Sequence, residues 1–290
     1  LQGDVGSGKT VVAFLSLLSA VEAGGQGVLM APTEILVQQH LENLRPLGNK
    51  VGVVVDALTG RDKGKERDRK LAALLEGKIH ILIGTHAVFQ SGVHFLDLRF
   101  AIIDEQHRFG VQQRLALGEK GQSVDVLVMT ATPIPRSLAL SQYGEMDLTV
   151  LTDKPAGRKP VKTVIISDNR VNEIVLKLKK AIDKKNQAYW VCPLIEESEV
   201  LDYTAAEDRF KALRANLGEG EVGLVHGQMN SDEKDEVMKK FSEGEIKVLV
   251  STTVIEVGVD VPSANIIVIE HAEKFGLAQL HQLRGRVGRG

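Results

Sequence analysis

The sequence predicts an α/β protein of two lobes, each built on a mostly parallel β-sheet flanked by helices. Two observations lead to this fold class. Short apolar runs alternate with longer amphipathic segments, which is the pattern of β-α-β units in a parallel sheet. The chain also has 290 residues, which is long for one hydrophobic core and fits two domains of about 150 residues each.

The composition supports a globular protein and excludes several other classes. Hydrophobic residues make up 43% and charged residues 26% of the chain, which excludes disordered and fibrous proteins. The net charge of -2 gives no overall positive field, so contacts with nucleic-acid phosphates must come from local groups. The single cysteine, Cys192, excludes an internal disulfide framework and suits a reducing compartment. No apolar run reaches the length of a membrane span, so we expect a cytoplasmic protein.

The first lobe is expected at residues 1–153. An apolar helix is predicted at residues 11–21, directly after a glycine-rich loop. Buried strands are predicted at residues 28–31, 51–55, 79–83, 100–103 and 126–129. The strand that should precede the glycine-rich loop is reduced to Leu1 and Gln2, so we expect the chain to begin inside a domain.

The apolar pattern breaks where two prolines, a glycine and several charges occur close together. We predict a linker at residues 154–160 and the second lobe at residues 161–290. Strands of the second lobe are predicted at residues 161–166, 188–192, 222–225, 248–250 and 266–269. Apolar residues at helical spacing predict a helix at residues 171–182, whose lysines are interpreted as a solvated face rather than a nucleic-acid surface. No obvious sequence repeat relates the two lobes.

A phosphate-binding loop opens the chain, since GDVGSGKT matches the pattern G-x-x-x-x-G-K-[ST] in front of an apolar helix. Glycines let backbone N–H groups turn toward phosphate oxygens, and the helix N-terminus adds its positive dipole end. Lys9 is expected to reach the β- and γ-phosphates of ATP, and Thr10 to ligate Mg²⁺. A glycine-rich turn that binds nothing is the alternative. The expected phosphate-binding residues are Gly3, Asp4, Val5, Gly6, Ser7, Gly8, Lys9 and Thr10.

Two adjacent carboxylates, Asp104 and Glu105, follow the strand predicted at residues 100–103. Ligands of parallel sheets bind at the carboxyl ends of the strands. Asp104 is therefore expected to hold Mg²⁺, and Glu105 to orient or deprotonate the water that attacks ATP. An acidic surface turn is the alternative, which the phosphate loop upstream disfavours.

Arginines near the end of the chain suggest a motor rather than a simple kinase or switch. Arg286 and Arg289 lie three residues apart in the run QLRGRVGRG, where they could act as arginine fingers on a γ-phosphate held by the other lobe. A basic surface loop is the alternative. Fingers from one lobe and ATP on the other would couple hydrolysis to closure of the cleft between the lobes.

The motifs occur in an order that resembles the RecG family of superfamily 2 helicases. The series is GDVGSGKT, APTEILVQQH, DEQH, TATPIPR, VHGQM, STTVIEVGVDVP and QLRGRVGRG, and it covers nearly the whole chain. DEQHRFG at residues 104–110 and QAYWVCPLIEES at residues 187–198 resemble RecG more than other families. A motor similar to Mfd or PriA is the alternative within the same chemistry, and a nucleotide-binding module without turnover is the alternative outside it.

The resemblance implies two RecA-like P-loop NTPase lobes, with ATP and Mg²⁺ between them and DNA across both. It further implies DNA backbone contacts, which position a protein without reading sequence, at Pro32, Thr33, Thr59, Gly60, Thr85, His86, Thr252 and Thr253. Residues that link the nucleotide site to DNA would be His107, Thr130, Thr132 and Arg136, and residues that line the interlobe cleft would be Asp260 and Gln282. From the residues alone, Thr33 could equally be a helix N-cap and Gly60 a plain turn.

The function expected from this resemblance is ATP-dependent translocation on double-stranded DNA in replication-fork reversal, branch migration, repair and recombination. The expected partner is branched or forked DNA, and the expected state is a monomer at the bacterial nucleoid without membrane association. Members of the family carry a wedge domain before the motor and a further strand and coupling segment after it, and we expect this chain to lack both. We therefore expect ATP hydrolysis and weak, salt-sensitive DNA binding, without unwinding of a model fork.

Overall fold

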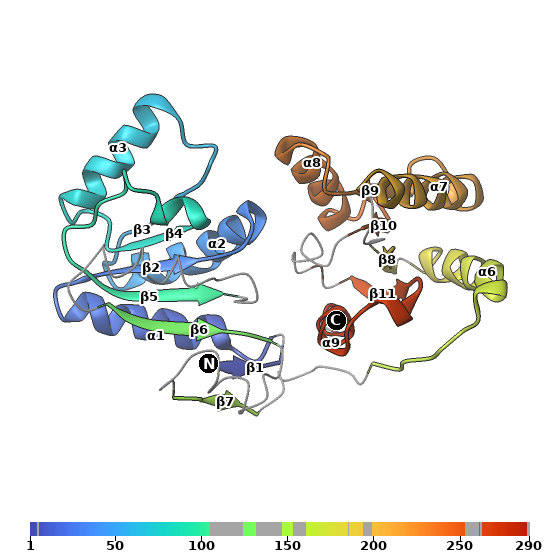
Figure 1. Ribbon diagram of the computed structural model, residues 1–290, viewed down its shortest axis with the longest axis horizontal. Helices are drawn as coiled ribbons and strands as arrows, with labels where there is room; N and C mark the ends of the chain where they lie inside the picture. The colour runs from blue at the N-terminus through green and yellow to red at the C-terminus, as the bar shows by residue number, and fades with distance from the viewer. Residues whose placement is uncertain are drawn as a thin grey trace. The chain divides into compact units, whose positions relative to one another are not determined.

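The chain forms two compact units, Leu1–Lys154 and Pro155–Gly290, which Figure 1 colours from blue to green and from yellow to red. The computed structural model describes residues 1–4, 6–104, 124–131, 147–152, 161–184, 186–193, 199–252, 261 and 263–288. Each unit has its own parallel sheet and its own hydrophobic core. The predicted fold class, two α/β lobes on parallel sheets, is confirmed.

The sheet of the first lobe has five parallel strands. Their order across the sheet is β3 (Val55–Leu58), β4 (Ile81–Gly84), β2 (Gln26–Met30), β5 (Leu98–Asp104) and β6 (Asp125–Met129). The short strand β1 (Gln2–Gly3) pairs with β7 (Val150–Leu151) and forms a bridge from Gln2 to Thr130, just after β6. The segment that leads into the phosphate loop is therefore attached to this edge of the sheet.

Helices cover both faces of the first sheet. Helices α1 (Lys9–Glu22) and α2 (Glu34–Lys50) pack on one face through apolar side chains such as Phe14 and Leu44, and α3 (Gly64–Leu75) packs on the other through Leu74. A short 3₁₀ helix, η1 (His86–Phe89), follows β4. Because both faces are covered, the strands are almost wholly apolar, as expected for a parallel sheet.

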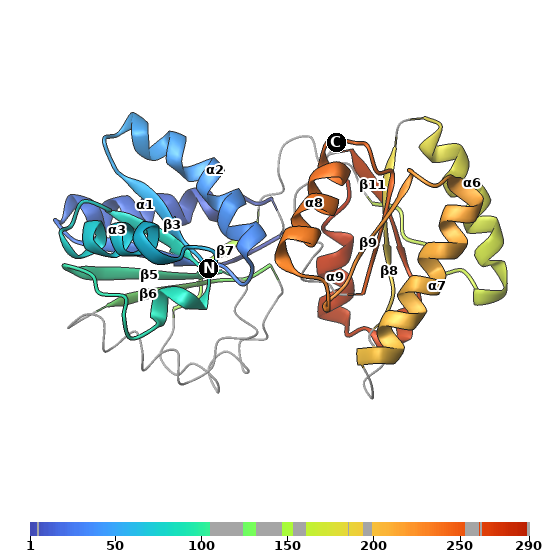
Figure 2. The same ribbon diagram turned by 90° about the horizontal axis from the view of Figure 1, so that it is seen from above.

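The second lobe repeats this arrangement with four parallel strands. Their order is β11 (Ala264–Ile269), β8 (Gln187–Val191), β10 (Val248–Ser251) and β9 (Val222–Val225). Helices α6 (Val171–Ile182) and α7 (Glu199–Leu217) lie on one face, while α8 (Ser231–Ser242) and α9 (Leu277–Arg284) lie on the other (Figure 2). The 3₁₀ helices η3 (Asp168–Arg170) and η5 (Ala272–Lys274) precede α6 and follow β11. Trp190 and Tyr189 are buried in β8, as their position in a predicted strand suggested.

Two predicted strands are wrong. Residues 51 and 52 form a turn, because α2 continues to Lys50 and Gly52 adopts the left-handed φ of 73°, and the strand begins only at Val55. Residues 161–166 are not a strand and pair with none of the described strands, and Ile165 is 101% exposed. A strand needs the backbone groups of a neighbour, which an apolar run in the sequence cannot guarantee.

A buried glutamine closes the amino end of the sheet in the first lobe. The side-chain amide of Gln26 donates hydrogen bonds to the carbonyl oxygens of Leu74 at 2.9 Å and Ile79 at 2.7 Å. Its side-chain oxygen accepts from the backbone N–H groups of Leu96 at 2.8 Å and Asp97 at 3.1 Å. One side chain thus satisfies the backbone groups of two turns that lead into β4 and β5.

Gln187 does the same in the second lobe. It stands at the start of β8, as Gln26 stands at the start of β2, and its amide donates to the carbonyl oxygens of Phe241 at 2.5 Å and Ile246 at 2.7 Å. Its side-chain oxygen accepts from the hydroxyl of Ser263. The two glutamines therefore mark equivalent positions in the two lobes.

A short sequence repeat accompanies these glutamines, although no obvious repeat relates the two lobes as a whole. Residues 76–79 read Glu-Gly-Lys-Ile and residues 243–246 read Glu-Gly-Glu-Ile. Both stretches follow a helix, both glycines have positive φ (71° at Gly77 and 78° at Gly244), and both lead into a buried strand. Only glycine adopts this backbone without strain, so the turn geometry explains why the motif occurs twice.

Candidate nucleotide-binding site

The phosphate loop depends on three glycines with different physical roles. Gly6 and Gly8 have φ angles of 80° and 92°, which favour glycine. Gly3 has no room for a side chain, because a Cβ there would collide with the hydroxyl of Ser7 and approach Leu151 within 3.1 Å. The spacing of these glycines, read from the sequence, therefore matches a tight turn in the structure.

Helix α1 begins without a side-chain cap. Gly8 is its N-cap, and no acidic residue lies in its first turn, whereas Thr33 caps α2 and Asn230 caps α8 through their side chains. The first N–H groups of a helix need an acceptor and carry a positive partial charge. A first turn of α1 without a side-chain cap is suited to a phosphate group.

Two polar side chains point into this loop. The ammonium group of Lys9 donates to the carbonyl oxygens of Gly3 at 2.7 Å and Asp4 at 3.0 Å. The hydroxyl of Ser7 is buried and has no hydrogen-bond partner among the described residues. A buried hydroxyl without a partner is costly, and a bound phosphate oxygen would satisfy it. The loop therefore fits the triphosphate of a nucleotide.

The loop and the acidic strand end lie along one edge of the sheet. Asp104, the last residue of β5, pairs with Met129 of β6. The next residue, Thr130, accepts a hydrogen bond from the backbone N–H of Gly3 at 3.2 Å and donates one to Leu1 at 3.1 Å. Thus the predicted magnesium ligand Asp104, the predicted coupling residue Thr130 and the start of the phosphate loop follow one another across adjacent strands.

The structure adds His40, which the sequence interpretation did not select. His40 of α2 lies with its Nε2 atom 2.9 Å from Oδ2 of Asp104, and the two side chains are 9% and 13% exposed. In the sequence, His40 is marked only as the last residue of the motif APTEILVQQH. Its distance from Asp104 along the chain does not indicate that the two side chains are in contact. Among the described residues, no group of three or more histidine, cysteine or acidic side chains could hold a metal ion alone.

The predicted DNA contacts of the first lobe also gather at the carboxyl ends of adjacent strands, after β2, β3 and β4. Pro32, Gly60 and His86 are exposed there. Thr59 and Thr85 are buried, and their hydroxyls accept hydrogen bonds from backbone N–H groups of nearby turns. These residues form one row, whose role in DNA binding stays a prediction.

Two polar groups of this row, the hydroxyl of Thr33 and the N–H of Gly60, already make hydrogen bonds to nearby residues. The hydroxyl of Thr33 accepts from the N–H of Leu36 at 3.3 Å and so acts as the N-cap of α2. The N–H of Gly60 donates to Glu34 at 3.0 Å. Both alternatives drawn from the sequence, a cap and a turn, therefore describe the local structure.

In the second lobe, Thr252 follows β10 and is buried, Gln282 is buried in α9, and Arg286 is partly exposed just after α9. The other predicted site residues lie outside the described part of the chain. They are Val5, Glu105, His107, Thr132, Arg136, Thr253, Asp260 and Arg289.

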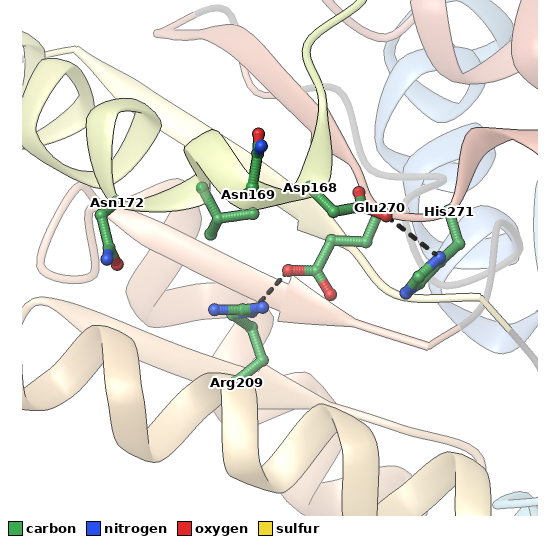
Figure 3. A pocket seen from close by; sticks show the side chains of 7 residues that line it. Asp168, Asn169, Asn172, Arg209, Glu270 and His271 are labelled. Carbon is green, nitrogen blue, oxygen red and sulfur yellow. Dashed lines mark ion pairs between the residues drawn. The ribbon is translucent and has the colours of Figure 1, made fainter.

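A polar pocket of about 260 Å³ lies within the second lobe, at the carboxyl end of β11 (Figure 3). Arg209 of α7 forms an ion pair with Glu270 at 2.5 Å, and His271 lies 3.9 Å from Asp168. His271 has a φ of 47°, which turns the chain away from the strand. None of the residues predicted to bind nucleotide or DNA lines this pocket.

The same carboxylate affects the single cysteine. Glu270 accepts a hydrogen bond from the indole N–H of Trp190 at 2.9 Å, and its other oxygen lies 4.0 Å from the sulfur of Cys192. Burial raises the pKa of Cys192 to about 12, with the negative charge of Glu270 adding to the effect and Arg209 opposing it. The thiol is therefore held in its protonated form.

Comparisons with known proteins agree with this geometry. Residues 1–140 match the model of the DEAD/DEAH box helicase family, and residues 170–290 match that of the helicase conserved C-terminal domain. The chain is similar along its whole length to the ATP-dependent DNA helicases RecG of Haemophilus influenzae (52% identity), Escherichia coli K12 (53%) and Bacillus subtilis (53%). The chain belongs to the RecG family.

The chain spans 43% of the length of these RecG relatives. A solved structure of RecG bound to a three-way DNA junction is similar over the whole chain, with a TM-score of 0.81 and 47% identity, and the match covers 38% of that structure's chain. The helicase Lhr of Mycobacterium smegmatis, at 18% identity and a TM-score of 0.72, shares the fold. No helix among the described residues is long and apolar enough to cross a membrane.

Proposed function

We propose that this RecG-family chain is the motor of an ATP-driven double-stranded DNA translocase or helicase, which acts on branched or forked DNA in fork reversal, branch migration, repair and recombination. The observation that carries the proposal is the continuous sheet edge on which Asp104, Thr130 and Gly3 lie on adjacent strands, beside a helix without a side-chain cap. The match to RecG relatives supports the choice of DNA over other substrates.

The residues of the first lobe would bind and hydrolyse ATP together with Mg²⁺. The loop N–H groups and Ser7 would hold the phosphates, and Lys9 would leave its carbonyl partners to face the β- and γ-phosphates. Thr10 and Asp104 would hold Mg²⁺, which when bound neutralises charge on the phosphate oxygens. Glu105 would orient the attacking water and take its proton.

Arg286 and Arg289 are the proposed arginine fingers. A guanidinium group stabilises the negative charge that builds on the transferring γ-phosphoryl group. Asp260 and Gln282 are proposed to contact the same nucleotide, while His107, Thr132 and Arg136 transmit its state to the DNA. The finger role is inferred from the spacing of the arginines, and the other roles come from the family resemblance. Each role can be tested by substituting the residue.

The proposed DNA surface of the first lobe is the row of Pro32, Thr33, Gly60 and His86, together with the backbone around Thr59 and Thr85; Thr252 and Thr253 would add contacts from the second lobe. Contacts of this kind bind the phosphate backbone, so affinity should fall linearly on a plot of log affinity against log salt concentration. Contact with phosphates alone would let the motor move along DNA of any sequence.

The test is ATP hydrolysis measured without DNA and with duplex, forked and single-stranded DNA. We expect turnover that branched or duplex DNA stimulates, and a Glu105→Gln variant that binds ATP but does not hydrolyse it. Nucleotide binding without turnover by the parent chain would instead support a binding module. A Glu105→Gln variant with the parent rate would overturn the catalytic assignment.

A further inference from the structure

His40 makes a contact that neither the motif pattern nor the proposed mechanism uses. It lies on the buried face of α2, beside Val37, Leu41 and Leu44. Its Nε2 atom is 2.9 Å from Oδ2 of Asp104. An ionised carboxylate can only accept a hydrogen bond, so the proton of this contact must be on Nε2 of the imidazole.

The contact restricts the carboxylate. Asp104 ends β5 with a side chain that is only 13% exposed, and one of its two oxygens is engaged by a ring held among packed apolar side chains. A rotation of the carboxylate would break a largely buried hydrogen bond to a charged group, which is costly. His40 therefore fixes the direction in which the remaining oxygen of Asp104 is presented.

The second lobe contains an equivalent pair with a different partner. Ile103 pairs with Met30 and precedes Asp104, just as Ile269 pairs with Val191 and precedes Glu270. Glu270 is thus the counterpart of Asp104.

The helices that supply the partners are also equivalent. Helix α2 leads from β2 into β3 and α7 leads from β8 into β9, and each sends one side chain to the acid at the end of the neighbouring strand. In the second lobe that side chain is Arg209, 2.5 Å from Glu270. Arginine is always charged, so Glu270 is neutralised permanently, whereas an imidazole holds Asp104 by a hydrogen bond without a fixed cation.

We propose that His40 is a positioning residue that orients the carboxylate of Asp104 toward Mg²⁺, and that a histidine rather than an arginine keeps this carboxylate available to the metal. The proposal rests on the proposed function, because it assumes that Asp104 is a magnesium ligand. Partners that hold a metal-binding side chain in place commonly change metal affinity or activity by about 10- to 100-fold when removed.

The test measures how Mg²⁺ strengthens the binding of a fluorescent ATP analogue by the 290-residue chain. Affinity is determined in excess EDTA and across a series of free Mg²⁺ concentrations. We expect His40→Ala to raise the half-saturating Mg²⁺ concentration about tenfold while affinity in EDTA is retained. His40→Arg, which copies the second lobe, should raise it further, because a fixed cation pairs with Asp104 and repels the metal.

His40→Gln is the rescue variant, since its amide nitrogen can still donate to Asp104, and we expect its Mg²⁺ requirement to stay within about threefold of the parent. His80→Ala is the matched control. His80 accepts a hydrogen bond from the N–H of Val54 at 2.9 Å, and both residues lie at the amino ends of strands in the same sheet, away from Asp104. We expect His80→Ala to lower the free energy of unfolding without changing the Mg²⁺ requirement.

The outcomes distinguish a wrong role for His40 from a wrong role for Asp104. If Asp104→Asn abolishes the effect of Mg²⁺ and the His40 variants keep the parent requirement, His40 is only structural and the inference is wrong. If Asp104→Asn itself responds to Mg²⁺ like the parent, Asp104 is not a magnesium ligand, and the proposed function of this site fails first. A loss of affinity equal in EDTA and in Mg²⁺ would also contradict a positioning role.

Discussion

The two lobes share the same arrangement of strands and helices but carry different functional groups at the carboxyl ends of their strands. Both start their central strand with a buried glutamine, Gln26 or Gln187, that satisfies the turns into neighbouring strands. Both place an acid at the carboxyl end of the strand next to the central one, paired with a side chain of the helix that follows the central strand: Asp104 with His40 of α2, and Glu270 with Arg209 of α7. Only the first lobe has the glycine loop before its first helix; the second has the 3₁₀ turn η3.

The comparison shows that the framework and the chemistry are separable. The glutamines serve backbone groups that every such sheet must satisfy when buried, so the same solution occurs twice. The acids differ in their surroundings, since Asp104 lies on the strand end near the phosphate loop and Glu270 is paired with a guanidinium group. The experiments below ask whether this division is as complete as the structure indicates.

The largest effect is expected at the start of α1, compared with the start of α6, the helix in the corresponding place of the second lobe. Lys9→Ala removes the cation of the phosphate loop, and we expect kcat for ATP to fall by about 10²–10³ or more, as for other charge-stabilising groups. Arg170, at the corresponding place before α6, pairs at the surface with Glu173 and with no other of the described residues. We expect Arg170→Ala to leave kcat within about twofold of the parent. Equal losses in the two variants would contradict a phosphate-binding loop that belongs to the first lobe alone.

The glutamine clamps should give matching losses of stability, each in its own lobe. Gln26→Leu or Gln187→Leu leaves several buried backbone groups without a partner, at a cost of about 3 kcal/mol or more. Trp190 is the sole tryptophan of the chain and lies in the second lobe, so its fluorescence follows that lobe during urea unfolding, while circular dichroism follows both.

We expect Gln187→Leu to lower the midpoint seen by tryptophan fluorescence, and Gln26→Leu to lower only the transition seen by circular dichroism. Gln38→Leu, at an exposed position of α2, is the control and should change neither. A shift of the tryptophan transition by Gln26→Leu as large as that by Gln187→Leu would show that the lobes unfold together.

A smaller effect is expected at Cys192. With its pKa raised to about 12, only about 10⁻⁴ of the thiol is ionised at pH 8, so reaction with a disulfide reagent should be far slower in the folded chain than in urea. The unfolded thiol ionises at lower pH than the folded one, so this group makes the folded state less stable as pH rises through that interval.

Glu270→Gln removes the negative charge that adds to this shift, and should speed the reaction several-fold. Glu273→Gln, at an exposed position near it, should not. Equal rates in folded and unfolded chains would show that the thiol is accessible and ionisable, against the burial described.

Much of the fold could be predicted from the sequence because buried parallel strands are continuous apolar runs. The strands at β8, β9, β10 and β11 were predicted within two residues. Residues 161–166 have the same apolar character, yet they find no partner strand among the described residues. Local composition cannot show whether a sheet has a free edge, and this is why that prediction failed.

The site was predictable where its chemistry is local. The phosphate loop is continuous in sequence, and its glycines occur where the backbone requires them. His40 was missed because its contact with Asp104 joins residues far apart in the chain through the packing of α2. The repeat around Gly77 and Gly244 was missed because it is only a few residues long, and only the structure shows that both glycines form equivalent turns.

The central claim is that one of two equivalent acids serves the nucleotide site. It is tested most directly by the Mg²⁺-dependent binding of a fluorescent ATP analogue to Asp104→Asn and Glu270→Gln, with each variant checked for folding by circular dichroism. We expect Asp104→Asn to lose the increase in affinity that Mg²⁺ gives, and Glu270→Gln to keep it. Loss of that increase in Glu270→Gln, or its retention in Asp104→Asn, would contradict the account.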